Sequence, residues 1–535
     1  MRNRNPHRPA ILAFLTGILW CCLASAALAH AALTGVVPAD GAVVDAPPQR
    51  LSLSFSEPVS PLVLKLVLPD GQVRVLDRFV LRDSTLEITP PEGLGTGTHV
   101  LTWRVVSEDG HPVGGSAVFS IGAPGNVPQA GAEAVDWPVR AALWLARTAL
   151  YAGLFFGIGG IFAVSWLMPG TAPWPVRAAL PLGLLATVLS LGLQGLDALG
   201  TPLSGLVDPA VWKAGLVTSF GATVAALAAA FCLAILAACV RPAALRRWAS
   251  LAALVLGSGA LALSGHASAA SPQWLTRPAV FIHAVTIAMW VGALLPLASA
   301  LRRDGDAGRM ALGRFSRLIP LCVGLLAAAG VVLAVIQVGT PAALLSTAYG
   351  NVLLAKIALL VLLAALVAVN RWMLTGPAAS GEARAVRRLC RAVAVESLIV
   401  LAIFAVAAAW RFTPPPRALA IAAAEPASVH IHSDKAMAEV TVTPGHAGPV
   451  DVSAVILTAD FAPLAAKEVS FVFSNPEAGI EPMRRKAELQ TDGSWRAADV
   501  VLPLAGPWQV RVDVLISDFE LVRLQDTVDI RPDAF

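Results

Sequence analysis

The chain has 535 residues, of which 56% are apolar and only 14% are charged, and its mean hydropathy is +0.70. Soluble globular proteins carry about 25% charged residues, so this composition excludes an ordinary soluble enzyme. The formal net charge of +4 is too small for a chain of this length to indicate nucleic-acid binding. The length allows roughly three or four domains.

The first 29 residues have the features of a secretory signal peptide. Three arginines precede an apolar run over residues 10–23, and Ala27-Leu28-Ala29 matches the small-x-small cleavage pattern. Cleavage after Ala29 would make His30 the first residue of the mature protein. An N-terminal histidine offers an amine and an imidazole to one metal ion, so His30 is a candidate ligand if partners lie elsewhere.

The sequence predicts a small β domain at each end of the mature chain. Residues 30–122 contain short runs that alternate apolar and polar residues, such as residues 51–56, separated by turn signals. This spacing predicts a β-sandwich or barrel. Residues 123–136 are typical of a linker, since they are rich in Pro, Gly and Ala. Residues 413–535 begin with a run of prolines and contain further strand-like runs, so we expect a second β-sandwich there.

Residues 137–412 contain eight apolar stretches long enough to cross a bilayer, for which about 20 residues are needed. The stretches lie near residues 145–168, 178–199, 213–240, 248–264, 278–301, 318–337, 350–370 and 392–411. Eight such stretches in series favour a bundle of eight transmembrane helices over helices buried in a soluble protein.

The arginines predict the orientation of this bundle. Fourteen lie in the loops after the first, third, fifth and seventh stretches: Arg177, Arg241, Arg246, Arg247, Arg302, Arg303, Arg309, Arg314, Arg317, Arg371, Arg384, Arg387, Arg388 and Arg391. The loops after the second, fourth and sixth stretches carry only Arg277. We therefore expect a multi-pass protein of the bacterial inner membrane with both mature termini in the periplasm, in agreement with the signal peptide.

The N-terminal domain contains a candidate metal site. Asp109 and His111 are two residues apart, and such residues point to the same face of an extended strand. Together with the amine and ring of His30, they offer three nitrogen donors and one oxygen. This set suits tetragonal Cu(II) better than Zn(II). From the spacing alone, however, a solvated Asp-Gly turn with an incidental histidine is the favoured explanation of the pair.

These residues carry a resemblance to a known family. Residues 30–122 resemble the periplasmic copper-binding CopC family, and residues 137–412 resemble the membrane protein CopD. The order of the parts is that of CopC–CopD fusion proteins, some of which carry a further YtkA-like domain at the C-terminus. The matching segments are His30, Pro38-Ala39-Asp40-Gly41, Leu53-Ser54-Phe55-Ser56-Glu57, Val106-Ser107-x-Asp109-x-His111 and Gly114-Gly115.

The resemblance implies a Cu(II) site formed by His30, Asp109 and His111, with Glu57 as a supporting or weakly binding group. It also implies copper uptake, homeostasis or resistance rather than an enzymatic activity. The expected partners are the copper ion, the lipid bilayer and periplasmic copper chaperones, with no nucleic acid and no nucleotide. Residues 30–135 contain no methionine, so we expect no Met-rich Cu(I) site in this domain.

The apolar region contains a second candidate copper site. His266 lies at the outer end of the fourth stretch, and His283 lies one or two turns into the fifth, followed by Met289. Ionisable residues at membrane depth are functional candidates, and imidazole and thioether both bind copper. The alternative is that His266 is an interfacial loop residue and His283 satisfies a neighbouring carbonyl group.

Sulfur and charge within the apolar region give weaker signals. Cys239, Cys322 and Cys390 lie near predicted cytoplasmic helix ends, and Cys232 shares a helix face with Cys239. Soft sulfur ligands favour Cu(I), so these residues could form an inner sulfur path, although cysteine is also a common buried residue. Lys356 and Glu396 are buried charges for which proton coupling and a packing contact both remain open.

The C-terminal domain contains a third candidate metal site. His430 and His432 share a strand face, and a hairpin could bring His446 close to them. A docking or purely structural domain is the alternative. His99 has no evident partner, and we expect it on the surface of a strand.

Three other functions are alternatives to copper transport. A membrane redox protein would use His266 and His283 to hold an outer-face haem or to reduce copper. A membrane-anchored periplasmic copper buffer would use only the external domain. A copper oxidase acting on polysaccharides is disfavoured, because Asp109 joins the site and the domain lacks an aromatic sugar-binding platform. The chain contains no nucleotide-binding motif, so ATP-driven transport within this chain is excluded.

Overall fold

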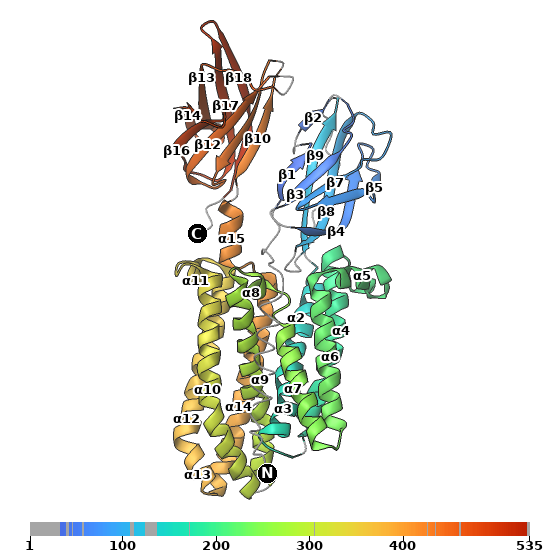
Figure 1. The fold of residues 1–535 in the computed structure, drawn as a ribbon, viewed down its shortest axis with the longest axis vertical. Helices are drawn as coiled ribbons and strands as arrows, with labels where there is room; N and C mark the ends of the chain where they lie inside the picture. The colour runs from blue at the N-terminus through green and yellow to red at the C-terminus, as the bar shows by residue number, and fades with distance from the viewer. Residues whose placement is uncertain are drawn as a thin grey trace, which may run out of the picture. The chain divides into compact units, whose positions relative to one another are not determined.

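The computed structural model describes residues 33–531 apart from residues 39–41, 45, 56–57, 108–111, 123–135, 171, 304, 425, 434 and 459–461. The chain divides into two compact units, Met1–Pro415 and Pro416–Phe535. The first unit holds an N-terminal β domain and the long helices, and the second holds a C-terminal β domain (Figure 1). This is the multidomain architecture that the sequence predicts.

The N-terminal β domain is a sandwich of two sheets. One sheet has the strand order β1-β3-β7-β6 and the other β2-β9-β8-β4-β5. Alternate residues of β3, Leu51, Leu53 and Phe55, are buried and form the core with residues of the facing sheet. The strands are β1 (Leu33–Val37), β2 (Ala42–Val44), β3 (Leu51–Phe55), β4 (Val59–Val67), β5 (Val73–Val75), β6 (Phe79–Arg82), β7 (Thr85–Ile88), β8 (Gly97–Ser107) and β9 (Pro112–Ile121).

His99 is buried, which corrects the expectation of a surface residue. It lies in β8 directly opposite Phe119 of β9, and the two rings stack with their centroids 5.3 Å apart. Its Nδ1 bonds with the carbonyl oxygen of Gly97 at 3.0 Å, whereas no hydrogen-bond partner reaches Nε2 from the described residues. The sequence pattern missed this because alternation does not show which face of a strand is covered.

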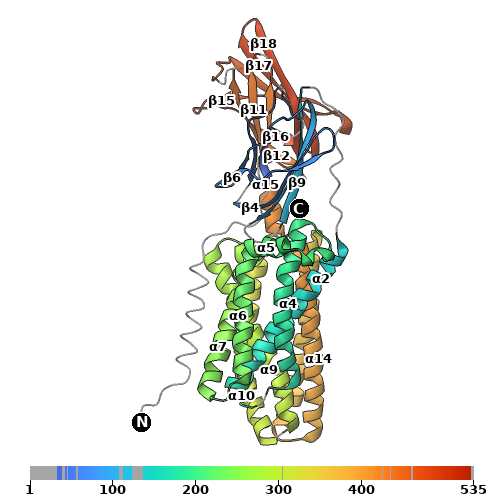
Figure 2. The ribbon, with the colours of Figure 1, turned by 90° about the vertical axis from the view of Figure 1, so that its right-hand side faces the viewer.

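The central region forms long helices that run side by side (Figures 1 and 2). The helices are α2 (Trp137–Ala152), η1 (Gly153–Ile158), α3 (Gly159–Trp166), α4 (Trp174–Leu199), η2 (Leu203–Val207), α5 (Pro209–Val217), α6 (Ser219–Cys239), α7 (Ala243–Ala260), α8 (His266–Ala269), α9 (Gln273–Arg303), α10 (Gly305–Val338), α11 (Ala343–Ser346), α12 (Ala348–Val369), η3 (Asn370–Leu374), α13 (Thr375–Ala379), α14 (Ala383–Ala408) and η4 (Ala409–Phe412).

Within the described residues, seven helices rather than eight are long and apolar enough to cross a membrane. They are Trp137–Trp166, Trp174–Leu199, Phe220–Cys239, Gln273–Arg303, Gly305–Val338, Ala348–Ala379 and Ala383–Ala420. The expected stretch at 248–264 overlaps α7 (Ala243–Ala260), which is not among them. This helix has 18 residues, carries Arg246 and Arg247 near its start and ends at Ala260. It packs against α3, α6 and α9.

Small residues allow α3 and α9 to approach closely. A Cβ atom added to Gly159 would lie 2.2 Å from the carbonyl oxygen of Ala288, and one added to Gly292 would lie 2.2 Å from the carbonyl carbon of Gly159. Only glycine fits at such a contact between membrane helices. This contact fixes the position of α9, the helix that carries His283.

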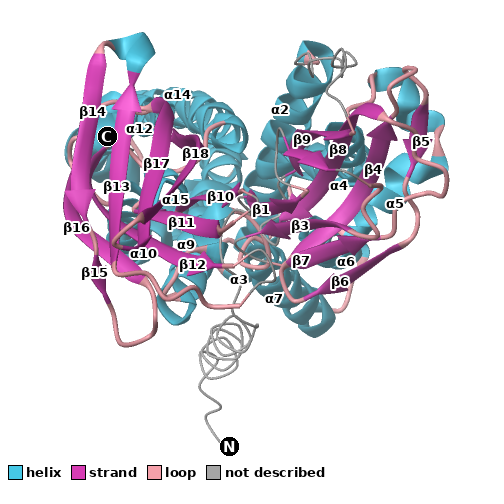
Figure 3. Cartoon of the chain, turned by 90° about the horizontal axis from the view of Figure 1, so that it is seen from above, coloured by secondary structure: helices cyan, strands magenta, loops and turns pink. Residues whose placement is uncertain are grey.

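The C-terminal unit begins with α15 (Pro416–Ala424) and continues as a second β-sandwich. Its sheets have the orders β10-β11-β12-β16-β15 and β14-β13-β17-β18 (Figure 3). Buried residues of both sheets, including Phe471, Phe473 and Trp508, form its core. The strands are β10 (Ala427–His432), β11 (Met437–Thr443), β12 (Gly448–Leu457), β13 (Glu468–Asn475), β14 (Ile480–Lys486), β15 (Glu488–Leu489), β16 (Trp495–Leu502), β17 (Gly506–Ser517) and β18 (Glu520–Ile530), with the short helix η5 (Pro476–Ala478).

Candidate functional site

The predicted N-terminal ligands His30, Glu57, Asp109 and His111 lie outside the described residues. The described residues that flank them are paired with one another. Leu33 of β1 lies opposite Phe55 of β3, and Val59 of β4 lies opposite Ser107 of β8. Val106 of β8 in turn lies opposite Pro112 of β9. The chain therefore enters and leaves all three segments at the same end of the sandwich.

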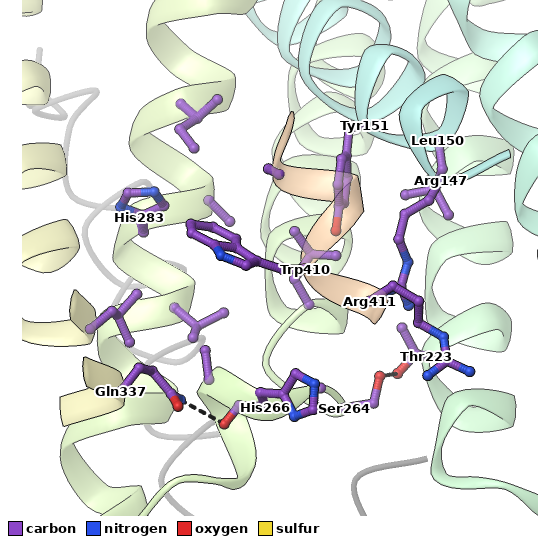
Figure 4. A pocket seen from close by; sticks show the side chains of 18 of the residues that line it. Arg147, Leu150, Tyr151, Thr223, Ser264, His266, His283, Gln337, Trp410 and Arg411 are labelled. Atoms are coloured by element: carbon purple, nitrogen blue, oxygen red, sulfur yellow. Dashed lines mark hydrogen bonds between the residues drawn. The ribbon is translucent and has the colours of Figure 1, made fainter. Parts of the chain in front are cut away.

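The long helices enclose a cavity of about 290 Å³ that brings together two predicted site residues. His266 of α8 and His283 of α9 both line it, with Trp410 of η4 and Gln337 of α10 (Figure 4). We call this space the outer cavity. Met289, the third residue of the predicted membrane site, is half-buried in α9 and is not among the described residues that line the outer cavity.

His283 is held in one orientation within the outer cavity. Its Nδ1 lies 3.3 Å from the carbonyl oxygen of Leu326 and donates a hydrogen bond to it, because a carbonyl oxygen can only accept. This fixes the tautomer in which Nε2 carries the lone pair. Histidines that bind metals commonly donate their other ring N–H to a carbonyl group in this way. Gly330 leaves room for the ring, since a Cβ atom there would lie 3.3 Å from Cε1 of His283.

His266 is positioned by its backbone. It begins α8 directly after Gly265, whose φ of 97° favours glycine, so the chain turns sharply at this point. The side-chain Nε2 of Gln337 donates a hydrogen bond of 2.8 Å to the carbonyl oxygen of His266. Gln337 is 2% exposed, and no donor among the described residues reaches its Oε1. The cavity wall thus offers an amide oxygen near the backbone of His266.

Three cationic side chains line the outer cavity: Arg147, Lys356 and Arg411. The Nζ atom of Lys356 lies 4.8 Å from the ring centre of Trp410, and Arg147 lies 5.6 Å from that of Phe220. None of the described lining residues carries a carboxylate group. A metal cation in this cavity is therefore repelled by its wall, unless an anion accompanies it.

Arg411 is the cationic residue of the outer cavity that has a carboxylate partner. It is 8% exposed, and its Nη2 lies 2.6 Å from Oδ2 of Asp197 in α4. The carbonyl oxygen of Asp197 also accepts a hydrogen bond of 3.0 Å from Arg104 of β8. The sequence reasoning missed Arg147 and Arg411 because it counted arginines only in loops. Their positions inside or at the end of apolar stretches are the signal that could have found them.

A second cavity of about 200 Å³ lies between α9, α10, α12, η3, α13 and α14, and we call it the inner cavity. Glu396 and Asn370 line it and are 4% and 5% exposed. Asn370 Nδ2 donates a hydrogen bond of 2.5 Å to Glu396 Oε1. Lys356 lines the outer cavity and Glu396 the inner one, so these two buried charges belong to different sites.

The cysteines of the predicted sulfur path are dispersed. Cys232 and Cys239 are exposed on α6, whereas Cys322 of α10 and Cys390 of α14 are buried. The Cys390 thiol donates to the carbonyl oxygen of Ala298, with Sγ 3.7 Å away. In the part of the chain that the structure describes, no three His, Cys, Asp or Glu side chains are close enough to hold one metal ion. The placement gives the sulfur path no support.

Two of the three predicted C-terminal histidines, His430 and His432, lie on the β10–β11 hairpin. The strand register places the third, His446, away from them. His430 and His432 are both exposed on one face of β10. Their cross-strand neighbours are Glu439 and Met437, and His430 Nδ1 lies 3.5 Å from Glu439 Oε2. His446 lies beyond the end of β11 and forms an isolated bridge with Arg531. The hairpin therefore places a carboxylate, not a third imidazole, opposite His430.

Four family models match successive parts of the chain. The matching family descriptions are the CopC domain (residues 33–122), Copper resistance protein D-like, N-terminal domain (135–276), Copper resistance protein D (309–410) and YtkA-like (430–513). The chain is 25% identical to the Copper transport protein CutJ of Bacillus subtilis (strain 168), over 94% of this chain and 96% of that protein.

The chain is similar, part by part, to CopC–CopD fusion proteins.

Further relatives cover the CopC part alone. The Copper resistance protein C of Xanthomonas campestris pv. juglandis is 38% identical over 18% of this chain and 86% of that protein. The crystal structure of CopC from Methylosinus trichosporium OB3b is 26% identical over 18% of this chain and 97% of that chain, with a TM-score of 0.16. The resemblance stated from the sequence is thus confirmed, and the long apolar helices make the chain a multi-pass membrane protein.

Both CopD-related matches contribute residues to the outer cavity. The N-terminal match, 135–276, contains His266, and the C-terminal match, 309–410, contains Gln337 and Lys356, as well as Glu396 of the inner cavity. His283 falls between the two matches, on α9. The outer cavity is therefore assembled from both CopD-related parts and from the helix that connects them.

Proposed function

We propose that this fusion protein captures Cu(II) with its CopC domain and passes copper inward across the bacterial inner membrane through its helices. The observation that carries the proposal is the outer cavity, which both His266 and His283 line although they come from separate helices. Nε2 of His283 is left with a lone pair for a metal, since Nδ1 is engaged by Leu326.

The capture site consists of His30, Asp109 and His111, with Glu57 as a supporting or weakly binding group. The paired strand ends around these residues support the proposal, because all the flanking segments meet at one end of the sandwich. The name of the Copper resistance protein C relative supports copper as the ion. Three nitrogen donors and a carboxylate oxygen favour the divalent state.

The transit site is the outer cavity. Conduction through a membrane requires a site that binds an ion but also releases it. Two imidazoles supply the binding, and the positive charges of Arg147 and Lys356 keep it weak. Copper that enters with an anionic ligand, or as Cu(I), meets less repulsion than bare Cu(II).

The proposed inward direction rests on the resemblance to copper-uptake proteins, and the expected orientation is consistent with it. The fourteen arginines in alternate loops support a cytoplasmic location for those loops, and the signal peptide supports periplasmic termini. The CopC domain would then receive copper in the periplasm, directly or from a copper chaperone. The outer end of the fourth stretch, where His266 lies, would face the same side of the membrane.

Copper accumulation in a strain that lacks this protein tests the proposal. The strain would be complemented at matched expression with the wild type, with His30→Ala plus His111→Ala, or with His266→Ala plus His283→Ala. We expect the wild type to raise cellular copper and both double variants to fail. Asn351→Ala, on the exposed start of α12, serves as a control that should behave as wild type.

Other outcomes identify the alternatives. A wild type that lowers cellular copper, or a membrane variant that behaves as wild type, would exclude the inward path and favour an exporter or a membrane-anchored buffer. A haem absorption spectrum in the purified protein, lost in the His266 and His283 double variant, would instead establish an outer-face redox protein.

A further inference from the structure

The inner cavity contains a buried carboxyl group with no cationic partner among the residues that the structure describes. Glu396 is 4% exposed, and its interaction in the described structure is the hydrogen bond from Asn370. Burying an ionised carboxylate without a compensating charge is costly, and such groups commonly bind a proton instead. The surroundings of Glu396 therefore favour its neutral form.

The charged and titratable groups around Glu396 offer little compensation. Arg371 is the other charged residue among the described lining of the inner cavity, and it is exposed and forms no ion pair with Glu396. The lining from α9, α10 and α13 is apolar or carries hydroxyl groups. On α14 itself, Arg391 lies five residues away and is exposed, and Cys390 lies six residues away. The neighbouring α10 carries the buried Cys322, and Tyr151 of α2 contacts α14 at Phe404, about 12 Å along the helix.

The partner of Glu396 has an unsatisfied acceptor. Asn370 is 5% exposed, and no described group donates to its Oδ1. A neutral carboxyl group can form a ring of two hydrogen bonds with a primary amide, in which the amide N–H and the carboxyl O–H both donate. The N–H bond is present at 2.5 Å. A proton on Glu396 is the donor that the amide oxygen lacks.

The local backbone explains why this amide faces the cavity. Asn370 begins η3, a π-helical turn, and such turns occur often at functional sites. Its carbonyl oxygen accepts bonds from both the hydroxyl and the N–H of Thr375, with the hydroxyl bond at 2.9 Å. The backbone of the turn is thus satisfied, and the side-chain oxygen is the acceptor left open.

The inner cavity shares its helices with the proposed copper path. On α12 and η3, Lys356 of the outer cavity and Asn370 of the inner cavity are 14 residues apart, about 21 Å along the helix. On α9, His283 and Trp290 are seven residues apart, about 10 Å. A movement of these helices that opens one cavity would also alter the other.

We propose that Glu396, paired with Asn370, is a proton-binding site whose loading and release are coupled to copper movement. The coupling rests on the transport function proposed above, whereas the proton site does not. In the conformation described, the carboxyl group holds the proton and the pair is neutral. Release of that proton leaves a buried carboxylate, which favours a conformation that opens the inner cavity to water.

Infrared spectroscopy of the full-length protein in lipid vesicles tests the proton site directly. We expect the C=O stretch of a neutral carboxylic acid at neutral pH, shifted by deuterium exchange. It should disappear in Glu396→Gln and change frequency in Asn370→Ala, but remain in Ser397→Ala, which alters the next buried residue of α14. The absence of this band, or its survival in Glu396→Gln, would overturn the proton site. A carboxylate band that responds to Na⁺ or Mg²⁺ would do the same and identify a cation site.

Copper flux into vesicles under an imposed pH gradient tests the coupling. We expect flux in the wild type and in Ser397→Ala to depend on the gradient, and flux in Glu396→Gln to be independent of it. Glutamine preserves the amide pairing without a titratable group, so this variant should remain folded. Flux that ignores the gradient in the wild type would refute the coupling. A wild type that shows the infrared band but moves no copper would refute the transport function and leave the proton site standing.

Discussion

A single glycine decides how much room the His283 ring has. A Cβ atom at Gly330 would lie 3.3 Å from Cε1 of His283, a tight contact, and 3.6 Å from Nδ1, an ordinary van der Waals distance. The ring would have to shift by a few tenths of an ångström, and a larger branched side chain would displace it further, which would weaken its hydrogen bond to Leu326 and move Nε2. The geometry of the proposed transit site therefore depends on the absence of a side chain on α10.

Gly330→Val should impair copper passage without preventing folding. The expected result is a loss of cellular copper accumulation comparable to that of His283→Ala, because the imidazole is displaced rather than removed. The matched control is Gly324→Val, also on α10, where an added Cβ meets nothing within 4 Å. Equal accumulation in the two glycine variants would show that the orientation of His283 is unimportant.

His99 makes the N-terminal domain sensitive to acid. Burial holds the pKa of its imidazole below the ordinary value, and the bond to the Gly97 carbonyl offsets this only in part. The unfolded chain therefore binds a proton near pH 6.5, where the folded domain does not. The free energy of unfolding of the N-terminal domain must therefore fall as the pH drops below about 6.5. It continues to fall until the pH reaches the lowered pKa of His99 in the folded domain.

Hydrogen exchange at β8 and β9 in the full-length protein measures this effect. We expect faster exchange of these strands at about pH 5.5 than at about pH 7.5, after correction for the intrinsic rate. His99→Phe, which keeps a ring against Phe119, should remove the additional acid sensitivity. If the variant retains the full pH dependence, another group is responsible.

At the scale of elements, the ion pair between Arg411 and Asp197 joins η4 to α4. Arg411 is buried, and loss of its carboxylate partner would leave a charge without compensation. Asp197→Asn should therefore lower stability by about 1–3 kcal/mol, a value reduced because the Asp197 side chain is 22% exposed. Thermal unfolding in detergent measures this change. Asp306→Asn, in the exposed pair with Arg309, should cost less than about 1 kcal/mol.

The sequence predicted the helices and strands well where a single hydrophobic pattern dominates the segment. Long apolar runs and alternating strand residues identified the helical region and both sandwiches, because burial is the main force behind each. The stretch at 248–264 was the exception, since α7 carries Arg246 and Arg247 and mixes small and polar residues. The π-helical turn at Asn370 has no sequence signature, because it depends on packing around the inner cavity.

Site residues were predictable only as far as chemistry alone could single them out. His266 and His283 were selected as rare imidazoles in an apolar region, and the structure places both at one cavity. Their environment was not predictable, because Arg147, Lys356 and Arg411 reach that cavity from three different helices. The register of β10 and β11 also could not be read from the sequence, so the separation of His446 from His430 emerged only in three dimensions.

At the scale of the whole molecule, a capture site and a transit site make different contributions to uptake. A tethered capture site raises the local copper concentration at the transit site and matters most when copper is scarce. The proposed transit site affects the rate at every concentration, because all copper that crosses would have to pass it. The fusion of a CopC domain to CopD helices in one chain thus predicts two kinetic phenotypes rather than one.

Uptake rates measured over a range of copper concentrations should separate these phenotypes. His30→Ala plus His111→Ala should raise the apparent KM, with uptake restored at high copper. His266→Ala plus His283→Ala should lower the maximal rate, and excess copper should not rescue it. Ser428→Ala, on the exposed face of β10, is a control expected to change neither parameter. If high copper restores uptake in the His266 and His283 double variant, the outer cavity does not lie on the copper path. If high copper fails to restore uptake in the His30 and His111 double variant, the CopC domain acts in passage rather than in capture.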